Sequence, residues 1–426
     1  MSVETPSAAR PIARALLIAA LASLVGQGSF AADKDYSQLP QRPASDHSAL
    51  SKPRFELPAL FKPRKDETQA MVLHGSITVL GEMIPPATYT RLSWKPQDTF
   101  EGIAAPTPVL VLNGAAPGPT LCLTGAVHGD EINGIEIIRQ VFFGLKAEEL
   151  AGVVIGVPIV NQLGFRLSSR YLPDRRDLNR YFPGDPTGSS ASRIAYSFFN
   201  DIIRHCDALV DIHTGSFHRT NVPQLRGDMG NAKVGQLIHG FGGMIVLHSV
   251  GARGTLRRAA ADSGVPAVTL EAGEPMRIQE DVVADGVERI LTLMTNMGIN
   301  KRSYYWSNAQ PVYLNSRWVR SEHGGLLISQ IAIGDKVKPG DLLGKVVDPI
   351  NNLEFPMHSP FEGRVIGMAL NQVVMPGYAV YHIGIQATEE SIEMTPQNER
   401  TNDGTPLPRK PGEPGEEHRS DLPEFD

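Results

Sequence analysis

The sequence predicts an α/β protein with a doubly wound, mostly parallel sheet and a smaller all-β domain towards its C-terminal end. Short apolar runs alternate with segments of helical periodicity between about residues 108 and 297, and right-handed crossovers between such strands place helices on both faces of a sheet. Near residue 310 the pattern changes to short strands separated by Gly and Pro turns. A content of 41% apolar residues is typical of a globular protein. A chain of 426 residues is longer than one hydrophobic core usually supports, so we expect a main domain and a smaller one.

The first 31 residues predict a signal peptide. Arg10 and Arg14 precede an apolar run over residues 15–25, and small residues stand at the −3 and −1 positions of a cut after Ala31. The run is short against the roughly 20 residues of a membrane span, so a membrane anchor is the weaker interpretation. We therefore expect export, to the periplasm, of a chain cleaved after Ala31.

Composition divides the remaining chain into segments. We expect a Pro-rich linker over residues 32–70, the α/β domain over 71–308, the β domain over 309–385 and a disordered acidic tail over 386–426. The net charge is −6, and the sequence has no basic stripe that would indicate binding of nucleic acid. It also has no second apolar span that would indicate a membrane domain. The sequence does not give the oligomeric state, so a homo-oligomer stays open.

The expected elements follow in order. Residues 76–80 and 89–94 alternate as half-buried strands, and residues 152–160 form the continuous apolar run of a buried parallel strand. Ser189 or Ser190 caps a helix that reaches about residue 205. Further strands are expected at residues 108–112, 244–247 and 265–270, and further helices at residues 255–262 and 281–297.

His128 and Glu131 follow an apolar strand at residues 120–124 and precede a run of apolar residues at helical spacing. The pair therefore lies at a strand-to-helix turn. A His and a carboxylate this close together can converge on one metal ion, although a helix cap with a solvated His is the common alternative.

A third candidate ligand, His213, ends another apolar strand at residues 208–212. The carboxyl ends of parallel strands form one crevice in an open α/β sheet, so distant strand ends meet there. Two histidines and a glutamate are a zinc ligand set that leaves one tetrahedral position for water. The sequence thus predicts one zinc ion per chain, held by His128, Glu131 and His213.

Over residues 75–384 the chain resembles the succinylglutamate desuccinylase and aspartoacylase family, zinc amidohydrolases related to the zinc carboxypeptidases. The resemblance is carried by six blocks in order: Gly118-Pro-Thr, Gly125-Ala-Val-His-Gly-Asp-Glu, Val157-Pro-Ile-Val-Asn, Asp177-Leu-Asn-Arg-Tyr-Phe-Pro-Gly-Asp, Asp211-Ile-His-Thr-Gly-Ser and Thr269-Leu-Glu-Ala-Gly. It implies a zinc-carboxypeptidase-like sheet and a C-terminal β domain similar to the barrel-sandwich fold of biotinyl and lipoyl carriers. No Lys stands at the hairpin of residues 350–354 where a carrier would need one, so we expect this domain to narrow the entrance to the site.

The resemblance also implies residue roles. Glu271, at the end of an apolar strand, matches the family's catalytic Glu, and Glu274 is its nearby competitor. Asn179 and Arg180 match the pair that binds the substrate carboxylate.

Arg170 matches the Arg that polarises the scissile carbonyl, but two extra residues before the Asn-Arg pair leave Arg175 and Arg176 open for that role. Arg219 follows His213 closely enough either to line the pocket and bind substrate or to fix the loop.

These observations predict a zinc hydrolase that cleaves the amide of a small N-acyl amino acid or related acyl compound. A periplasmic zinc carboxypeptidase or amidase acting on peptidoglycan peptides is the alternative enzyme, and a binding protein without turnover is a third interpretation. The two cysteines, Cys122 and Cys206, lie in apolar surroundings. We expect buried free thiols, while a disulfide stays open.

Overall fold

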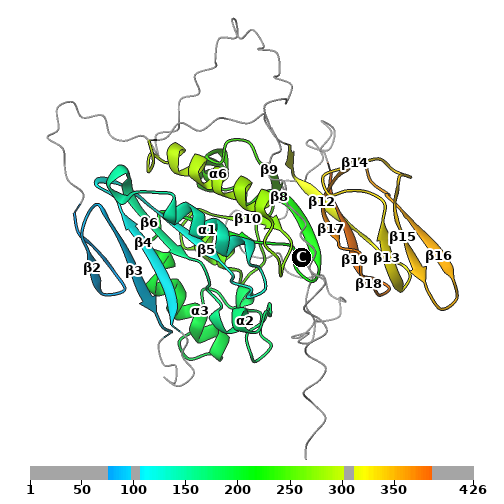
Figure 1. Cartoon of the computed structure of the whole chain (residues 1–426), viewed down its shortest axis with the longest axis horizontal. Helices are drawn as coiled ribbons and strands as arrows, with labels where there is room; N and C mark the ends of the chain where they lie inside the picture. The colour runs from blue at the N-terminus through cyan, green and yellow to red at the C-terminus, as the bar shows by residue number, and fades with distance from the viewer. Residues whose placement is uncertain (1–74, 97–105, 302–310, 386–426) are drawn as a thin grey trace, which may run out of the picture. The chain divides into compact units, whose positions relative to one another are not determined.

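The computed structural model describes residues 75–96, 106–301 and 311–385, which Figure 1 colours from blue to red. The expected signal peptide, the linker and the acidic tail all lie outside these ranges. Within them no helix is long and apolar enough to cross a membrane.

Four parallel strands form the centre of a large sheet, in the order β10 (Ala267–Gly273), β7 (Ala208–His213), β5 (Ala116–Gly125) and β6 (Ala151–Val157). β7 and β10 are buried along their whole length, as expected of strands covered on both faces. The register pairs Glu271 with His213 in the neighbouring strand. Polar residues at the carboxyl ends of these strands therefore come together at one edge of the sheet.

Antiparallel strands flank this parallel centre. On one side β6 pairs with β4 (Thr107–Asn113), which pairs with β3 (Thr88–Trp94). On the other side β10 pairs antiparallel with β8 (Arg219–Gly227). The next strand, β9 (Ile245–His248), pairs in parallel with β8. The α/β class is thus confirmed, but the large sheet is mixed, and the expected doubly wound arrangement stays a prediction. β1 (Ile77–Val79) and β2 (Glu82–Ile84) form a separate hairpin.

Helices contribute to two apolar clusters that the central strands separate. Neighbouring residues of β5 alternate between them, Leu123 in the first cluster and Cys122 in the second. The first contains residues of α1 (Asn133–Phe143), α4 (Ala232–His239) and α6 (Glu280–Asn296); the second contains residues of α3 (Ser190–Asp201) and α5 (Leu256–Asp262). Ser189 caps α3 as predicted, because its hydroxyl accepts the Ser192 N–H at 3.4 Å.

The C-terminal strands form a β-rich region with its own apolar core, and some of them extend the large sheet. A four-stranded sheet has the order β16 (Leu353–His358), β15 (Leu342–Asp348), β13 (Gly325–Ser329) and β18 (Val373–Val374). The large sheet takes up β17 (Gly363–Ala369), β19 (Ala379–Ile385) and β12 (Asn315–Arg320), with the short strands β11 (Val312–Tyr313) and β14 (Lys336–Val337) at its sides.

β17 makes the junction by pairing antiparallel with β8. A side chain at Gly367 would come within 2.6 Å of Asn221 Oδ1, so the junction favours glycine at that position. The pairing brings residues of the C-terminal strands next to the strand that follows His213.

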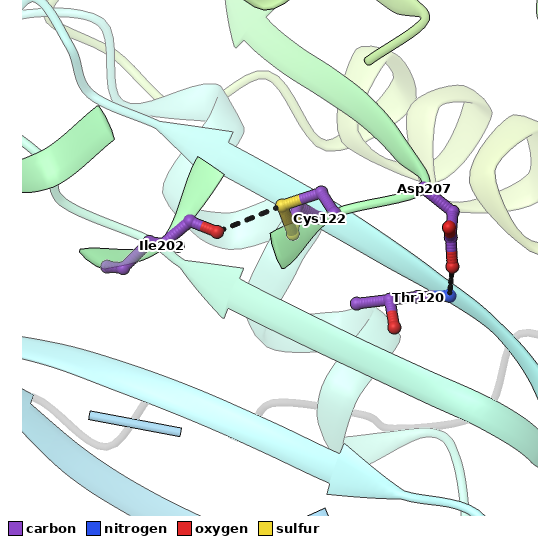
Figure 2. Close-up of a disulfide and its surroundings, with 5 residues drawn as sticks. Thr120, Cys122, Ile202 and Asp207 are labelled. Atoms are coloured by element: carbon purple, nitrogen blue, oxygen red, sulfur yellow. Dashed lines mark hydrogen bonds between the residues drawn. A yellow bond between two sulfur atoms is a disulfide. The ribbon is translucent and has the colours of Figure 1, made fainter. Parts of the chain in front are cut away.

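Cys122 and Cys206 form a disulfide, so the expectation of two free thiols is wrong (Figure 2). Cys122 lies on β5, and Cys206 precedes the neighbouring strand β7, which brings their Cα atoms to 5.8 Å. A hydrogen bond from the Thr120 N–H to the Asp207 carboxylate, 2.8 Å long, holds the same two segments together. Apolar surroundings could not reveal the pairing, because they suit a buried thiol and a buried disulfide equally.

Candidate metal and active site

His128 and Glu131 lie in the turn between β5 and α1, and both are almost fully buried. The turn packs closely on α2 (Gln162–Arg166): a side chain at Gly129 would overlap the backbone of Gly164 and Phe165. Glycine at this position therefore lets the turn approach α2 and carry its two polar side chains inward.

His213, at the end of β7, joins this pair. Its Nδ1 lies 2.9 Å from Glu131 Oε2 and 3.2 Å from His128 Nδ1, and His128 Nδ1 lies 2.8 Å from Glu131 Oε1. The candidate ligand atoms all lie within 4.8 Å of one another. The predicted ligand set is thus brought together, and its members are buried.

The second ring nitrogen of each histidine faces a carboxylate. His128 Nε2 lies 3.1 Å from Asp177 Oδ1, and His213 Nε2 lies 2.8 Å from Asp211 Oδ2. With the ring proton on Nε2, each neutral imidazole presents its Nδ1 lone pair to the other and to Glu131. Lone pairs that converge in this way suit a divalent cation, and two imidazoles with one carboxylate are a donor set that fits zinc.

The charges of the cluster shift its pKa values in opposite directions. Burial lowers the pKa of His213, but the carboxylates of Asp211 and Glu131 outweigh burial and raise it well above its ordinary value. Burial raises the pKa of Glu131, yet the two imidazoles outweigh it and hold that pKa far below its usual range. Glu131 is therefore ionised, as a metal ligand must be, and the raised pKa of His213 means that a metal ion must displace a proton to bind its Nδ1.

Arg170 lies against the ligand cluster. Its guanidinium donates to Asp177 Oδ2 from Nη2 at 2.8 Å and to Glu131 Oε1 from Nη1 at 3.3 Å, and Nη1 is also 3.1 Å from His128 Nδ1. Phe217 packs on its face, with the ring centre 5.4 Å from the guanidinium carbon. Arg170 thus lines the cavity at the ligands.

The competing arginines point elsewhere. Arg176 forms an exposed ion pair with Asp174, and neither it nor Arg175 is among the described residues that line the cavity. Position therefore favours Arg170 for contact with a substrate carbonyl.

Glu271 is buried near the carboxyl end of β10 and lines the same cavity. Asn221 Nδ2 donates to its Oε2 at 2.9 Å, and Arg226 Nε lies 3.3 Å from its Oε1. Glu274 instead pairs with Arg277 at 3.0 Å and is not among the described lining residues. The geometry thus places Glu271, and not Glu274, beside the ligands.

Asn179 and Arg180 lie in a 3₁₀ turn, η3 (Leu178–Arg180), and both line the cavity. The Asn179 Oδ1 accepts the Leu256 N–H at the start of α5, 2.7 Å away, and Arg180 Nη1 donates to the Asn179 carbonyl at 3.0 Å. These bonds hold the turn in the position at which Asn179 and Arg180 line the cavity.

Arg219 is not among the described lining residues, which gives no support to the substrate-binding role expected from the sequence. It is buried, and its Nε donates to the Ala379 carbonyl at 3.0 Å. Its guanidinium carbon lies 4.4 Å from the ring centre of Tyr378 and 5.2 Å from that of Trp318. Arg219 therefore links the loop after His213 to the C-terminal β region, the second role that the sequence left open.

The cavity has a volume of about 330 Å³ and takes residues from both parts of the described chain. Sequence reasoning missed a set of its polar and aromatic lining residues: Arg226, His248, Ser249, Arg257, Ser316, Trp318 and His382. No motif marks them, because strand pairing at β8 and β17 brings most of them together. The wall formed by Ser316, Trp318 and His382 comes from the C-terminal β region.

Fold and site define a class: α/β proteins with a buried His-Glu-His cluster at the carboxyl edge of a sheet. The family model described as the succinylglutamate desuccinylase/aspartoacylase catalytic domain matches residues 117–297. An N-alpha-acetyl-L-2,4-diaminobutyric acid deacetylase from Halomonas elongata is 30% identical over 233 residues, which are 52% of this chain and 68% of that protein. The chain belongs to the succinylglutamate desuccinylase/aspartoacylase family.

Solved structures show the same fold. The product-bound ectoine utilization protein EutE from Ruegeria pomeroyi has a TM-score of 0.65 and 25% identity, over 75% of this chain and all of that one (100%). A succinylglutamate desuccinylase from a Silicibacter species has a TM-score of 0.64 and 24% identity, over 75% and 99% of the two chains. Its likeness supports the fold alone.

Proposed function

We propose that this protein is a zinc-dependent hydrolase that cleaves the amide bond of a small N-acyl amino acid or related acyl compound. The convergence of His128, Glu131 and His213, each imidazole backed by a carboxylate, carries the proposal. The proposal is also supported by the family to which this chain belongs, because that family contains a deacetylase of an N-acetyl amino acid. A zinc ion bound by these three residues would supply a Lewis acid that lowers the pKa of water and polarises a carbonyl.

The chain's own residues would carry out the remaining steps. The Glu271 carboxylate accepts a proton from the attacking water and delivers it to the amine nitrogen as the carbon–nitrogen bond breaks. Arg170 donates a hydrogen bond to the carbonyl oxygen while negative charge develops there. Asn179 and Arg180 hold the carboxylate of the amino acid, which fixes the amide between Glu271 and Arg170. The products are a carboxylic acid and a free amine.

The cavity wall from the C-terminal β region favours a small substrate over the peptidoglycan peptides of the rival proposal. A volume of about 330 Å³ is at the lower end for small-molecule sites, and a polypeptide needs an open groove. Trp318 and His382 supply this wall with their rings stacked, the centroids 4.4 Å apart. The wall thus discriminates by exclusion.

One experiment separates the candidates. The purified protein is incubated with a panel of N-acyl amino acids and, in parallel, with muropeptides, and the products are identified by mass spectrometry. The proposal expects release of free amino acids from the first panel. Faster turnover of muropeptides or long peptides would contradict the proposal and favour a carboxypeptidase or amidase. The absence of any turnover would favour a binding protein.

We also propose that the protein is exported. The disulfide between Cys122 and Cys206 supports this, because disulfides persist in oxidising compartments and are rare in the reducing cytosol. The Arg-flanked apolar run before Ala31 supports it from the sequence. N-terminal sequencing of protein recovered from the periplasm should find a chain that begins near residue 32, and a chain that keeps residues 1–14 would contradict the proposal.

A further inference from the structure

Glu271 is bound by a buried amide that is not part of the cavity lining. Asn221 Nδ2 donates to Glu271 Oε2 at 2.9 Å, and the two residues are 7% and 6% exposed. Glu271 lines the cavity, while Asn221 is not among the described residues that line it. The amide can therefore act on a substrate only through the Glu271 carboxylate.

A β-bulge in β8 brings Asn221 to this position. Two steps along β10 separate Glu271 from Gly273, but their partners on β8, Gln224 and Asn221, are three steps apart. Without the extra residue, Val222 would stand opposite Gly273, and a slip of one residue turns a side chain to the other face of the sheet. Bulges are frequent next to active sites, where they redirect a side chain. The bulge thus lets the Asn221 side chain reach the Glu271 carboxylate.

The bulge belongs to the junction with the C-terminal β region. Pro223 lies inside it, and Pro is confined in sheets to edge strands, strand ends and bulges because it has no N–H for the ladder. Gln224 is fully buried, and its Nε2 donates to the Ile366 carbonyl of β17 at 3.0 Å. β17 is itself irregular between Val365 and Gly367. Both strands of the junction therefore depart from regular pairing beside Asn221.

β17 also leaves the space that the Asn221 amide occupies. Gly367 is in register with Asn221, and a Cβ at Gly367 would come to 2.6 Å from Asn221 Oδ1. Two atoms do not pack at that separation, so a side chain there would displace the amide or β17. The position of the amide thus depends on a strand of the C-terminal β region.

A general base needs such a restraint. Its carboxylate must stay within reach both of the attacking water and of the amine nitrogen, although a Glu side chain rotates about several single bonds. Misplacement of a reacting group by about 1 Å can cost about 10²-fold in rate. An uncharged amide donor restrains the carboxylate and leaves its charge in place.

We propose that Asn221 is a positioning residue for the general base Glu271, and that β17 sets the place of Asn221 through Gly367. The inference rests on the proposed function, because it concerns the proton transfer that Glu271 carries out there. The C-terminal β region thus takes part in the reaction as well as in excluding large substrates: its strand β17 keeps the amide where it orients the base.

Steady-state kinetics of Asn221→Ala test this role. With the best N-acyl amino acid of the panel, we expect kcat to fall by about 10- to 100-fold, while KM stays within about threefold and the zinc content is unchanged. Thr220→Ala is the matched control, because Thr220 is the preceding residue of β8, pairs with Met368 and is not among the described lining residues. An unchanged kcat in Asn221→Ala, or a loss of zinc, would overturn the proposal.

A double-mutant cycle with Gly367→Ala separates positioning from a general loss of structure. In the wild-type background the added Cβ displaces the amide, so kcat should fall by about threefold or more. In Asn221→Ala there is no amide to displace, so the second substitution should change kcat by less than about twofold. Losses that multiply independently, or a Gly367→Ala variant with wild-type kcat, would contradict the dependence on β17.

Crystal structures show the position of Glu271 without any turnover. The zinc-loaded wild type should hold the carboxylate in one conformation bound to Asn221, and Asn221→Ala should show it displaced or divided between conformations. If no N-acyl amino acid is hydrolysed but Glu271 moves in the variant, the positioning role stands and the proposed reaction fails. If N-acyl amino acids are hydrolysed and Glu271 keeps its place in the variant, the proposed function stands and the positioning role is wrong.

Discussion

Cys122 and Cys206 form a disulfide between the segments that lead to two candidate metal ligands. Cys122 lies on β5, which leads to His128, and Cys206 lies just before β7, which ends at His213. The two strands are parallel neighbours, with Cys122 in register with Leu209. The covalent link therefore ties together the bases of the two strands whose other ends carry the histidines.

We predict that loss of this disulfide destabilises the fold. The cysteines are 84 residues apart, and closing a loop of that length removes unfolded-state entropy worth about 4 to 5 kcal/mol in the chain-entropy model. Reductant should lower the melting temperature of the wild type by roughly 10 °C in a calorimetric scan. The Cys122→Ala, Cys206→Ala variant is the control and should melt at the same temperature with and without reductant. A wild type whose disulfide is reduced without a change in melting temperature would contradict the prediction.

We predict that Asp211→Asn weakens metal binding without removing a ligand. Asp211 contacts His213 Nε2 at 2.8 Å and is itself held by the Thr124 hydroxyl at 2.7 Å, so it fixes the tautomer that leaves Nδ1 free to bind. Loss of such a carboxylate usually costs about 10- to 100-fold in metal affinity. Competition with a chromophoric chelator measures the affinity, and an unchanged dissociation constant would argue against the inferred tautomer.

For Glu271→Gln we expect the metal to stay and the rate to fall by about 10² to 10⁴, the usual span for a general base. Glu274→Gln is the control: Glu274 pairs with Arg277 outside the described cavity lining, so its variant should keep most of the activity. Steady-state kinetics together with metal analysis of both variants checks this. The reverse pattern would move the role of base to Glu274.

His382 should make the protein less stable in acid. Its pKa is about 3 in the folded chain, against an ordinary value of 6.5, because of burial and the neighbouring Arg226 and Arg219. Between these values the unfolded chain binds the extra proton, so stability is full above pH 6.5 and falls as the pH drops towards 3, by up to about 1.4 kcal/mol per pH unit. His382→Phe keeps an aromatic ring and removes the titration. Urea unfolding at pH 4.5, 5.5 and 6.5 should give a shallower pH dependence for this variant, and parallel slopes would contradict the assignment.

The sequence could predict those site residues that stand at the ends of apolar strands. His128, His213 and Glu271 each follow such a run, and the structure brings them to one cavity because the strands are neighbours in the sheet. Local patterns were enough for them, since the end of a buried strand is itself the feature that positions the side chain.

The rest depends on long-range pairing. Arg226 reaches the cavity because β8 pairs with β10, and His382 reaches it because β19 pairs with β17, which pairs with β8; no local pattern encodes these registers. Arg219 is close to His213 in sequence, but it packs against rings of the C-terminal β region and is not among the described residues that line the cavity. The disulfide of Cys122 depends in the same way on which strands are neighbours.

The central claim is that this chain hydrolyses an amide with a metal ion held by His128, Glu131 and His213. The most direct test titrates metal-depleted protein with zinc while release of free amino acid from an N-acyl amino acid is followed. Activity should rise linearly and level off at one zinc per chain, and the His128→Ala, His213→Ala variant should neither bind zinc stoichiometrically nor turn over. Full activity in the metal-depleted protein, or stoichiometric zinc in the double variant, would contradict the account.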